Sequence, residues 1–289
     1  MRRKRQGKAT LLDPDLFSSK GFRFGISQQL LQQIALGGAM IALPIYLQMV
    51  LEYNALQAGL SLAPLSLSMF GVALLAGRRA GRRRPSSIIR VGFALLAVGM
   101  LSLIPIVPRA DSGWYLLVPP AIAGSGLGLL VSQLNNYTLA PISEERVSEA
   151  AGVNSAGGSF GLSFGLAFAG AIMLATLSIT FTNLAEASTV LAPAQKQRVA
   201  TALEDDAQVL SNTQLQELLK SQPEATRDEI IRINTDARPL ALQVALLVPI
   251  LAGLSGCLHL PRARSPTGRS PHRAALPGAH AGRRWTASS

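Results

Sequence analysis

Six long apolar segments constrain what this chain can fold into more than any other feature of its sequence. A helix needs about 20 mainly apolar residues to cross a bilayer, and lipid offers the backbone no hydrogen-bonding partner outside such a helix. One segment of this kind could be a buried helix of a soluble protein, but a chain of 289 residues is too small to bury six. The segments are 24–51, 56–77, 88–107, 115–138, 156–182 and 239–260. We therefore expect an all-α polytopic membrane protein with six transmembrane helices.

The basic residues lie mostly outside these segments and gather in every second connection, on one side of the membrane. Lys and Arg gather in 1–23, 78–90 and 261–289, whereas the short connections 52–55 and 108–114 hold almost none. If the first span starts inside, all three clusters are cytoplasmic, as the positive-inside rule requires. We expect a plasma-membrane protein with both termini in the cytoplasm. The net charge of +11 then reports topology and contact with the lipid bilayer, and we expect no nucleic-acid partner.

This topology divides the chain into a basic cytoplasmic arm (1–23), a six-helix bundle (24–260) and a basic tail (261–289). The tail is rich in Arg, Pro, Ser, Ala and Gly without an acidic residue, which is typical of disorder. It is either a native extension or the product of a shifted reading frame. The bundle includes a long extracytoplasmic loop, 183–238. Within it the apolar pattern from Ala192 to Leu219 predicts a small helical cap.

The apolar segments contain no acidic residue, and Glu52, at the outer end of the first, comes closest. An ionisable group inside a membrane is costly and usually functional, so its absence argues against a buried proton-coupling carboxylate. No phosphate-binding loop, metal-ligand cluster or nucleophile motif is present in the sequence. We expect no enzyme activity, no cofactor and no metal site.

Uncharged polar residues interrupt the apolar pattern of two spans. The first span holds Gln29 as well as Gln28, Gln32 and Gln33, which makes two pairs at i,i+4 spacing on a helix. Amides at matching depth on two helices could bind each other as interhelical contacts, which is the plainer interpretation, or line a substrate cavity. The candidate cavity residues are Gln28, Gln32, Gln33, Gln133, Asn135 and Asn136.

Small residues recur inside the fourth and fifth spans at spacings that let two helices approach closely. Such small-xxx-small spacing brings backbones together in membrane bundles. The candidate packing glycines are Gly124, Gly128, Gly157, Gly161 and Gly165. Prolines that we expect to interrupt helices are Pro44, Pro64, Pro119 and Pro249.

Several short stretches resemble the major facilitator superfamily, and more narrowly its fourteen-span drug–proton antiporter branch. They are Leu43–Gln48, Leu56–Pro64, Leu75–Pro85, Ala123–Gly128, Ala150–Asn154 and the lead-in Leu11–Phe17. The resemblance covers about 11–260 and matches the last six spans of that branch, with the first eight spans absent. It implies a cytoplasmic basic motif at Gly77, Arg78, Arg82 and Arg83. The acidic residue usual in that motif is replaced by Gly81, and the arginine usual after Asn154 is missing.

The resemblance implies a transporter of the multidrug or small-molecule efflux type, of which this chain is a fragment or half. Its two sets of three spans should be inverted repeats. Without a buried carboxylate, the chain alone should not perform proton-coupled export. The expected partners are a drug-like substrate, if it is part of a complete transporter, and a second half-transporter or a second copy of the chain. The alternative is a membrane scaffold or partner subunit of a transport complex that does not itself transport.

Overall fold

Six long helices make up the computed structural model of this chain, which describes residues 14–78, 84–109, 112–197 and 211–259. Each is long and apolar enough to cross a membrane, and the described residues contain no β-strand. The expected all-α fold with six transmembrane helices is therefore confirmed. The helices are α1 Lys20–Ile45, α2 Ala55–Arg78, α3 Pro85–Ile106, α4 Val118–Leu139, α5 Val147–Ala187 and α8 Glu224–His259.

Shorter elements connect these helices. A π-helical turn, Tyr46–Val50, extends α1, and the 3-10 turns are Pro14–Ser18, Val107–Arg109, Gly113–Leu116 and Glu144–Arg146. A seven-residue helix, α7 Asn212–Leu218, lies in the connection before α8. The tail 261–289, the centre of the predicted cap and the first part of the predicted arm lie outside the described residues. The last part of that arm is helical, because α1 begins at Lys20 after the N-cap Ser19.

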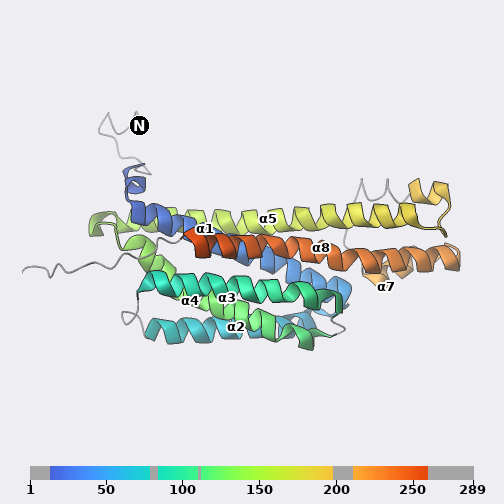
Figure 1. Ribbon diagram of the computed structural model, residues 1–289, viewed down its shortest axis with the longest axis horizontal. Coiled ribbons are helices and arrows are strands. Elements are labelled where there is room, and N and C mark those ends of the chain that lie inside the picture. Colours follow the sequence, from blue (N-terminus) through green and yellow to red (C-terminus); the bar gives the residue numbers. More distant parts are fainter. Residues whose placement is uncertain (1–13, 79–83, 110–111, 198–210, 260–289) are drawn as a thin grey trace, which may run out of the picture.

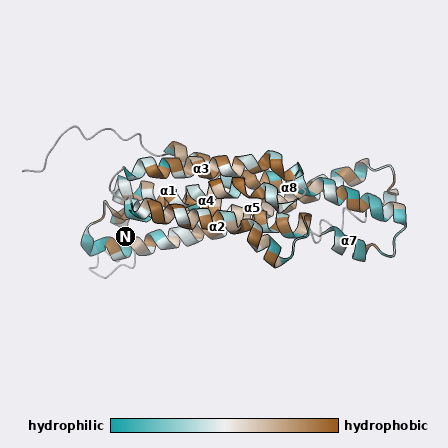
Figure 2. Ribbon diagram, turned by 90° about the horizontal axis from the view of Figure 1, so that it is seen from below, coloured by the Kyte–Doolittle hydropathy of each residue, from teal (hydrophilic) through white to brown (hydrophobic). Residues whose placement is uncertain are grey.

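Two helices are longer than the apolar segments within them. α5 begins before the predicted 156–182 span and ends after it, and α8 starts at Glu224, directly after Pro223, rather than near 239. Figure 1 shows both helices projecting side by side beyond the other four, with α7 beside them. The projecting ends are more hydrophilic than the rest of the helices (Figure 2). Much of the predicted loop 183–238 is therefore a paired extension of two spans.

The pairing of the helices has an approximate two-fold pattern. α4 packs against α2 and α3, while α1 packs against α5 and α8, and the contacts α1–α4 and α3–α8 join the two sets. Exchanging α1 with α4, α2 with α5 and α3 with α8 maps these contacts onto each other. This is the arrangement expected of two inverted three-helix repeats. The extensive α5–α8 contact is the exception, because it continues along the projecting ends.

Glycines permit the closest crossing between α1 and α5. A Cβ atom on Gly161 would lie 2.8 Å from the carbonyl oxygen of Leu30, and one on Gly165 would overlap that of Ile34. Gly37 of α1 makes the reciprocal approach to the backbone of α5. Gly157 differs, since its nearest neighbour would be an Ile26 methyl group at an ordinary 3.8 Å.

The α4 helix is enclosed between α2 and α3 in a similar way. A Cβ atom on Gly124 or Gly128 would overlap backbone atoms of α2, and one on Gly126 would meet the backbone of α3. Of the prolines expected to interrupt helices, Pro44, Pro64 and Pro249 are internal. Pro119 is not, because it lies in the first turn of α4, where its missing amide hydrogen is not needed.

Candidate functional site

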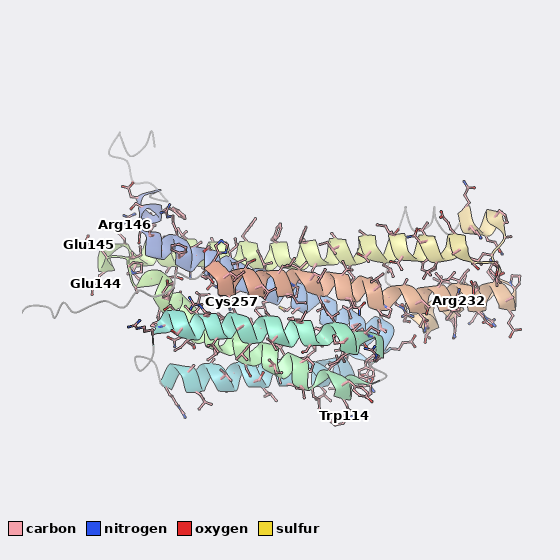
Figure 3. All side chains as sticks on the ribbon, viewed as in Figure 1. Trp114, Glu144, Glu145, Arg146, Arg232 and Cys257 are labelled. Carbon is pink, nitrogen blue, oxygen red and sulfur yellow. The ribbon has the colours of Figure 1, made fainter. Side chains whose placement is uncertain are left out.

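A polar cavity of about 510 Å³ opens between α1, α4 and α5. It lies in the half of the bundle nearer to Glu144, Glu145 and Arg146, which Figure 3 shows at the end opposite the projecting Arg232. Asn154, one of the lining residues, is about 12 Å along α5 from Arg146 at 1.5 Å per residue. The cavity is therefore within the span region rather than on a connecting loop.

Amides and hydroxyls from three helices line this cavity. On α1, Gln29 shares a face with Gln32 and Gln33, which lie three and four positions further along the helix. On α5, Gly158 has no side chain, which leaves room for these amides. A Cβ atom there would lie 3.3 Å from Nε2 of Gln29 and 3.6 Å from Nε2 of Gln33. The polar lining residues are Gln29, Gln32, Gln33, Asn135, Asn154, Ser155 and Ser159. Apolar contacts come from Val131, Leu134 and Leu162.

One hydrogen bond crosses the cavity wall from α5 to α4. Nδ2 of Asn154 donates to Oδ1 of Asn135 at 3.0 Å, and Asn154 is only 5% exposed. The carbonyl oxygen of the same Asn154 side chain is buried, as is that of Gln33, and neither accepts a hydrogen bond from any described residue. The cavity thus keeps hydrogen-bonding capacity that the described protein does not use.

The structure brings together some of the predicted cavity residues and separates others. Gln32, Gln33 and Asn135 line the cavity. Gln28 and Gln133 are buried but lie outside its lining, and Asn136 is exposed elsewhere on α4. Both amide atoms of Gln28 are buried without a hydrogen-bond partner among the described residues.

Two lining amides were not among the predicted set. Gln29 shares a face with Gln33, and this i,i+4 spacing is the signal that could have found it. Asn154 precedes the apolar segment 156–182, so the sequence analysis assigned it to a connection. Because α5 starts at Val147, Asn154 is inside this helix. It lies four residues before Gly158, on the face that also holds Gly161 and Gly165.

The predicted cytoplasmic basic motif is only partly described. Gly77 and Arg78 form the last turn of α2, and the space around the α-carbon of Gly77 is open. Gly81, Arg82 and Arg83 lie outside the described residues. Among the described residues, no three His, Cys, Asp or Glu side chains are close enough to hold a metal ion.

A second polar region lies at the opposite end of the bundle, around Arg238 of α8. This side chain is 3% exposed, and its guanidinium donates to the carbonyl oxygens of Met49 and Asn234 and to Oδ1 of Asn212. Arg238 is the last residue of the predicted loop 183–238, and nothing in the apolar pattern marks it as buried.

Glu52 joins the same region from the turn between α1 and α2. It has a φ of 54°, and its carboxylate accepts hydrogen bonds from the backbone nitrogen of Thr213, at 3.0 Å, and from the Thr213 hydroxyl. Burial alone would raise the pKa of Glu52, but these bonds, the Asn212 amide and the Arg238 charge together hold that pKa below its usual value. Through Thr213 and Asn212, Glu52 and Arg238 thereby link α7 to the end of α1 and to α8.

Comparison with known proteins gives the last observation on this site. Residues 3–166 match the sequence profile of the Major Facilitator Superfamily. The chain is 26% identical over 159 residues to the probable actinorhodin transporter of Streptomyces coelicolor, covering 54% of this chain and 28% of that protein. It is 32% identical over 159 residues to a multidrug resistance protein B homolog of Mycobacterium tuberculosis, covering 52% and 29%.

The puromycin resistance protein pur8 of Streptomyces alboniger is also similar, at 32% identity over 139 residues, with 46% of this chain and 28% of that protein covered. The matched region spans less than a third of the length of these three relatives. Their similarity to this chain therefore concerns part of a longer polypeptide.

Proposed function

The chain belongs to the major facilitator superfamily, and on this premise we propose that its bundle supplies one half of the substrate pathway of a small-molecule efflux transporter. The observation that carries the proposal is the amide-lined cavity between α1, α4 and α5. Its volume falls in the range of about 300–1,000 Å³ that is usual for small-molecule sites. The relatives named for multidrug and puromycin resistance support efflux as the direction of transport.

A second helix bundle would complete the pathway, either from another part of a longer polypeptide, from a separate chain or from a second copy. Two features support this part of the proposal. The cavity opens at one side of the bundle, and α2 exposes large apolar side chains along its length, among them Leu60, Leu67 and Phe70. The predicted apolar segments carry no carboxyl group, so groups of the second bundle would supply the proton coupling.

Both termini would lie in the cytoplasm, with the cavity nearer to that side and the α5–α8 extension outside. The distribution of Lys and Arg supports this orientation. The chain has a single cysteine, Cys257, which can be changed to serine to give a background for labelling. In this background Gln222→Cys, on the extension, should react with an impermeant maleimide in intact cells. Ser143→Cys should react only after the cells are opened, and the reverse result would overturn the orientation.

Photolabelling tests the cavity directly. The purified chain in lipid nanodiscs is irradiated with benzophenone-4-carboxamide, its uncharged N,N-dimethyl derivative or its cationic amidine, and the labelled peptides are identified by mass spectrometry. We expect label on the cavity faces of α1 and α5 from at least one probe. Loss of one hydrogen bond in Gln33→Leu should weaken that labelling by about two- to tenfold, whereas Gln222→Leu should not. Absence of cavity label from all three probes would overturn the proposed site.

Vesicle measurements test the need for a second bundle. The purified chain in vesicles with a pH gradient should give no proton flux that depends on an added substrate. Robust substrate-dependent flux from this chain alone would contradict the second-bundle proposal, while leaving the cavity as the candidate site.

A further inference from the structure

We propose that the cavity between α1, α4 and α5 selects uncharged polar ligands, such as amides, lactams and hydroxylated aromatic molecules, and discriminates against cations. This inference rests on the proposed function, because it assigns a ligand class to that same cavity. It follows from three properties of the lining: its charge, its hydrogen-bonding groups and its apolar area.

The lining carries no charge within the described residues. Its polar groups are amides and hydroxyls, which offer partial dipoles rather than a counter-ion. The acidic residues near this end of the bundle, Glu144, Glu145 and Glu149, belong to the connection and the first turn of α5, and none lines the cavity. Glu149 forms an ion pair with Arg146 at 3.5 Å. A cation that entered would lose its hydration without meeting a carboxylate, which is strongly unfavourable.

The lining offers both donors and acceptors, because amide groups and serine hydroxyls lie along it. The carbonyl oxygens of Asn154 and Gln33 have no partner among the described residues, but they are buried with almost no accessible surface. A bound ligand would therefore pair with the more accessible amide and hydroxyl groups. Such dipoles can pair with an uncharged polar ligand, whereas they do not replace the hydration of a cation.

The apolar side chains determine the rest of the ligand. Val131, Leu134 and Leu162 lie beside the amides, so a small aromatic or aliphatic group of the ligand can be buried against them while its polar group meets the amides.

Three related probes test the ligand class, because they share one aromatic body and differ in charge. Benzophenone-4-carboxamide is neutral and donates two hydrogen bonds, its N,N-dimethyl derivative is neutral and donates none, and benzophenone-4-carboxamidine is a cation at neutral pH. In nanodiscs we expect both neutral probes to label the cavity peptides. Labelling by the amidine should be at least about tenfold weaker than labelling by the neutral amide.

Two substitutions should reverse the preference between the amide and the cation. Asn154→Asp keeps the shape of the side chain but removes the donor to Oδ1 of Asn135, and Gln33→Glu adds a carboxylate from α1. Either should raise amidine labelling above amide labelling, and using both protects the test against one variant that does not fold. The control Gln222→Glu adds the same charge on the far extension and should leave the order of the three probes unchanged.

The outcomes separate this inference from the function on which it rests. Cavity labelling that is equal for all probes, or strongest for the amidine, would overturn the ligand class but keep the substrate site. Failure of both acidic variants to favour the amidine, with folding verified by gel filtration, would also overturn it. No cavity labelling by any probe would overturn the proposed function and the ligand class together.

Discussion

The two polar regions of the bundle differ in how fully their groups are paired. At the outer end, Arg238 is buried and donates to three acceptors, and the exposed Glu52 accepts two hydrogen bonds from Thr213, so both charged groups have partners. In the cavity the groups are neutral, yet Gln33 and Asn154 each keep a buried oxygen without a partner among the described residues. Paired polar groups rigidify a structure, whereas unpaired ones are available to a ligand or a moving neighbour.

This contrast also explains which region can tolerate a charge. Isolated charges are very costly to bury, but a guanidinium with several acceptors and a nearby carboxylate can remain ionised. Arg238 meets that requirement because α7 and the end of α1 converge on it. No comparable set of partners surrounds the cavity in the described part of the chain. We therefore expect the outer region to hold α7 against α1 and α8, and the inner region to bind a ligand.

The largest effect should come from breaking the outer region at Arg238. The substitution Arg238→Met keeps the length of the side chain but removes the donor to the Met49 and Asn234 carbonyl oxygens and to Oδ1 of Asn212. Each hydrogen bond to a charged group contributes about 1.5–3 kcal/mol, so losing three should lower the free energy of unfolding in mild detergent by at least about 3 kcal/mol.

A matched control for Arg238 lies on the same helix. Arg232 is also an α8 arginine with acidic partners, Glu229 and Asp236, but its side chain is 54% exposed. Exposed ion pairs contribute about 0–1 kcal/mol, so Arg232→Met should change the stability little. Equal losses from the two substitutions would show that the burial of Arg238 is not what matters.

The next largest effect should come from the helix crossing that forms one wall of the cavity. A leucine at Gly165 would overlap the backbone of α1 at Ile34, and forcing the helices apart should cost about 1–3 kcal/mol. Gly157→Leu is the control, because that position has only an ordinary contact, at 3.8 Å. Thermal unfolding monitored by circular dichroism measures both. A similar loss at the two positions would contradict the assigned crossing.

The accuracy of the sequence analysis follows the physical origin of each signal. Spans were predictable because lipid imposes a length and composition on every helix that crosses it, and six such segments became six helices. The projecting ends of α5 and α8 were missed because outside lipid a helix can be polar, so the apolar pattern stops before the helix does. Asn154 was missed for this same reason.

Partners that are distant in the sequence could not be predicted at all. The contact between Glu52 and Thr213 joins residues far apart in the chain, and no local pattern encodes their approach. The amides of α1 were recognised as unusual, but only the crossing of α1 and α5 decides that Gln33 lines the cavity while Gln28 does not. Sequence therefore indicated the chemistry of the site better than its exact membership.

A smaller effect should be seen when Glu52 is protonated. Because its pKa is held below the usual value in the folded protein, its contribution is fully present above the ordinary glutamate pKa. That contribution is lost as the pH falls through the lowered folded pKa. A dye on Gln216→Cys in a Cys257→Ser background should report looser attachment of α7, as lower anisotropy, between neutral pH and about pH 3.

The substitution Glu52→Gln separates this effect from other titrations near α7. Glu217 also lies on α7, where it pairs with Lys220 at 2.6 Å in an exposed position. Glu52→Gln removes the carboxylate charge that accepts hydrogen bonds from Thr213 and leaves Glu217 unchanged. It should therefore lower the anisotropy at neutral pH and flatten the dependence of the anisotropy on pH. An unchanged pH profile in this variant would show that Glu52 is not the group responsible for the loosening of α7.

The smallest effect should come from removing an amide that is already unpaired. Both amide atoms of Gln28 are buried without a partner among the described residues. Gln28→Met should therefore leave the free energy of unfolding unchanged or raise it slightly, because an apolar side chain of similar shape has no buried polar atom that needs a hydrogen bond. Asn154→Leu is the comparison, because it breaks the bond to Asn135 and should cost about 1 kcal/mol. If Gln28→Met instead costs more than Asn154→Leu, Gln28 is paired, and the contrast between an open inner region and a closed outer one fails at that residue.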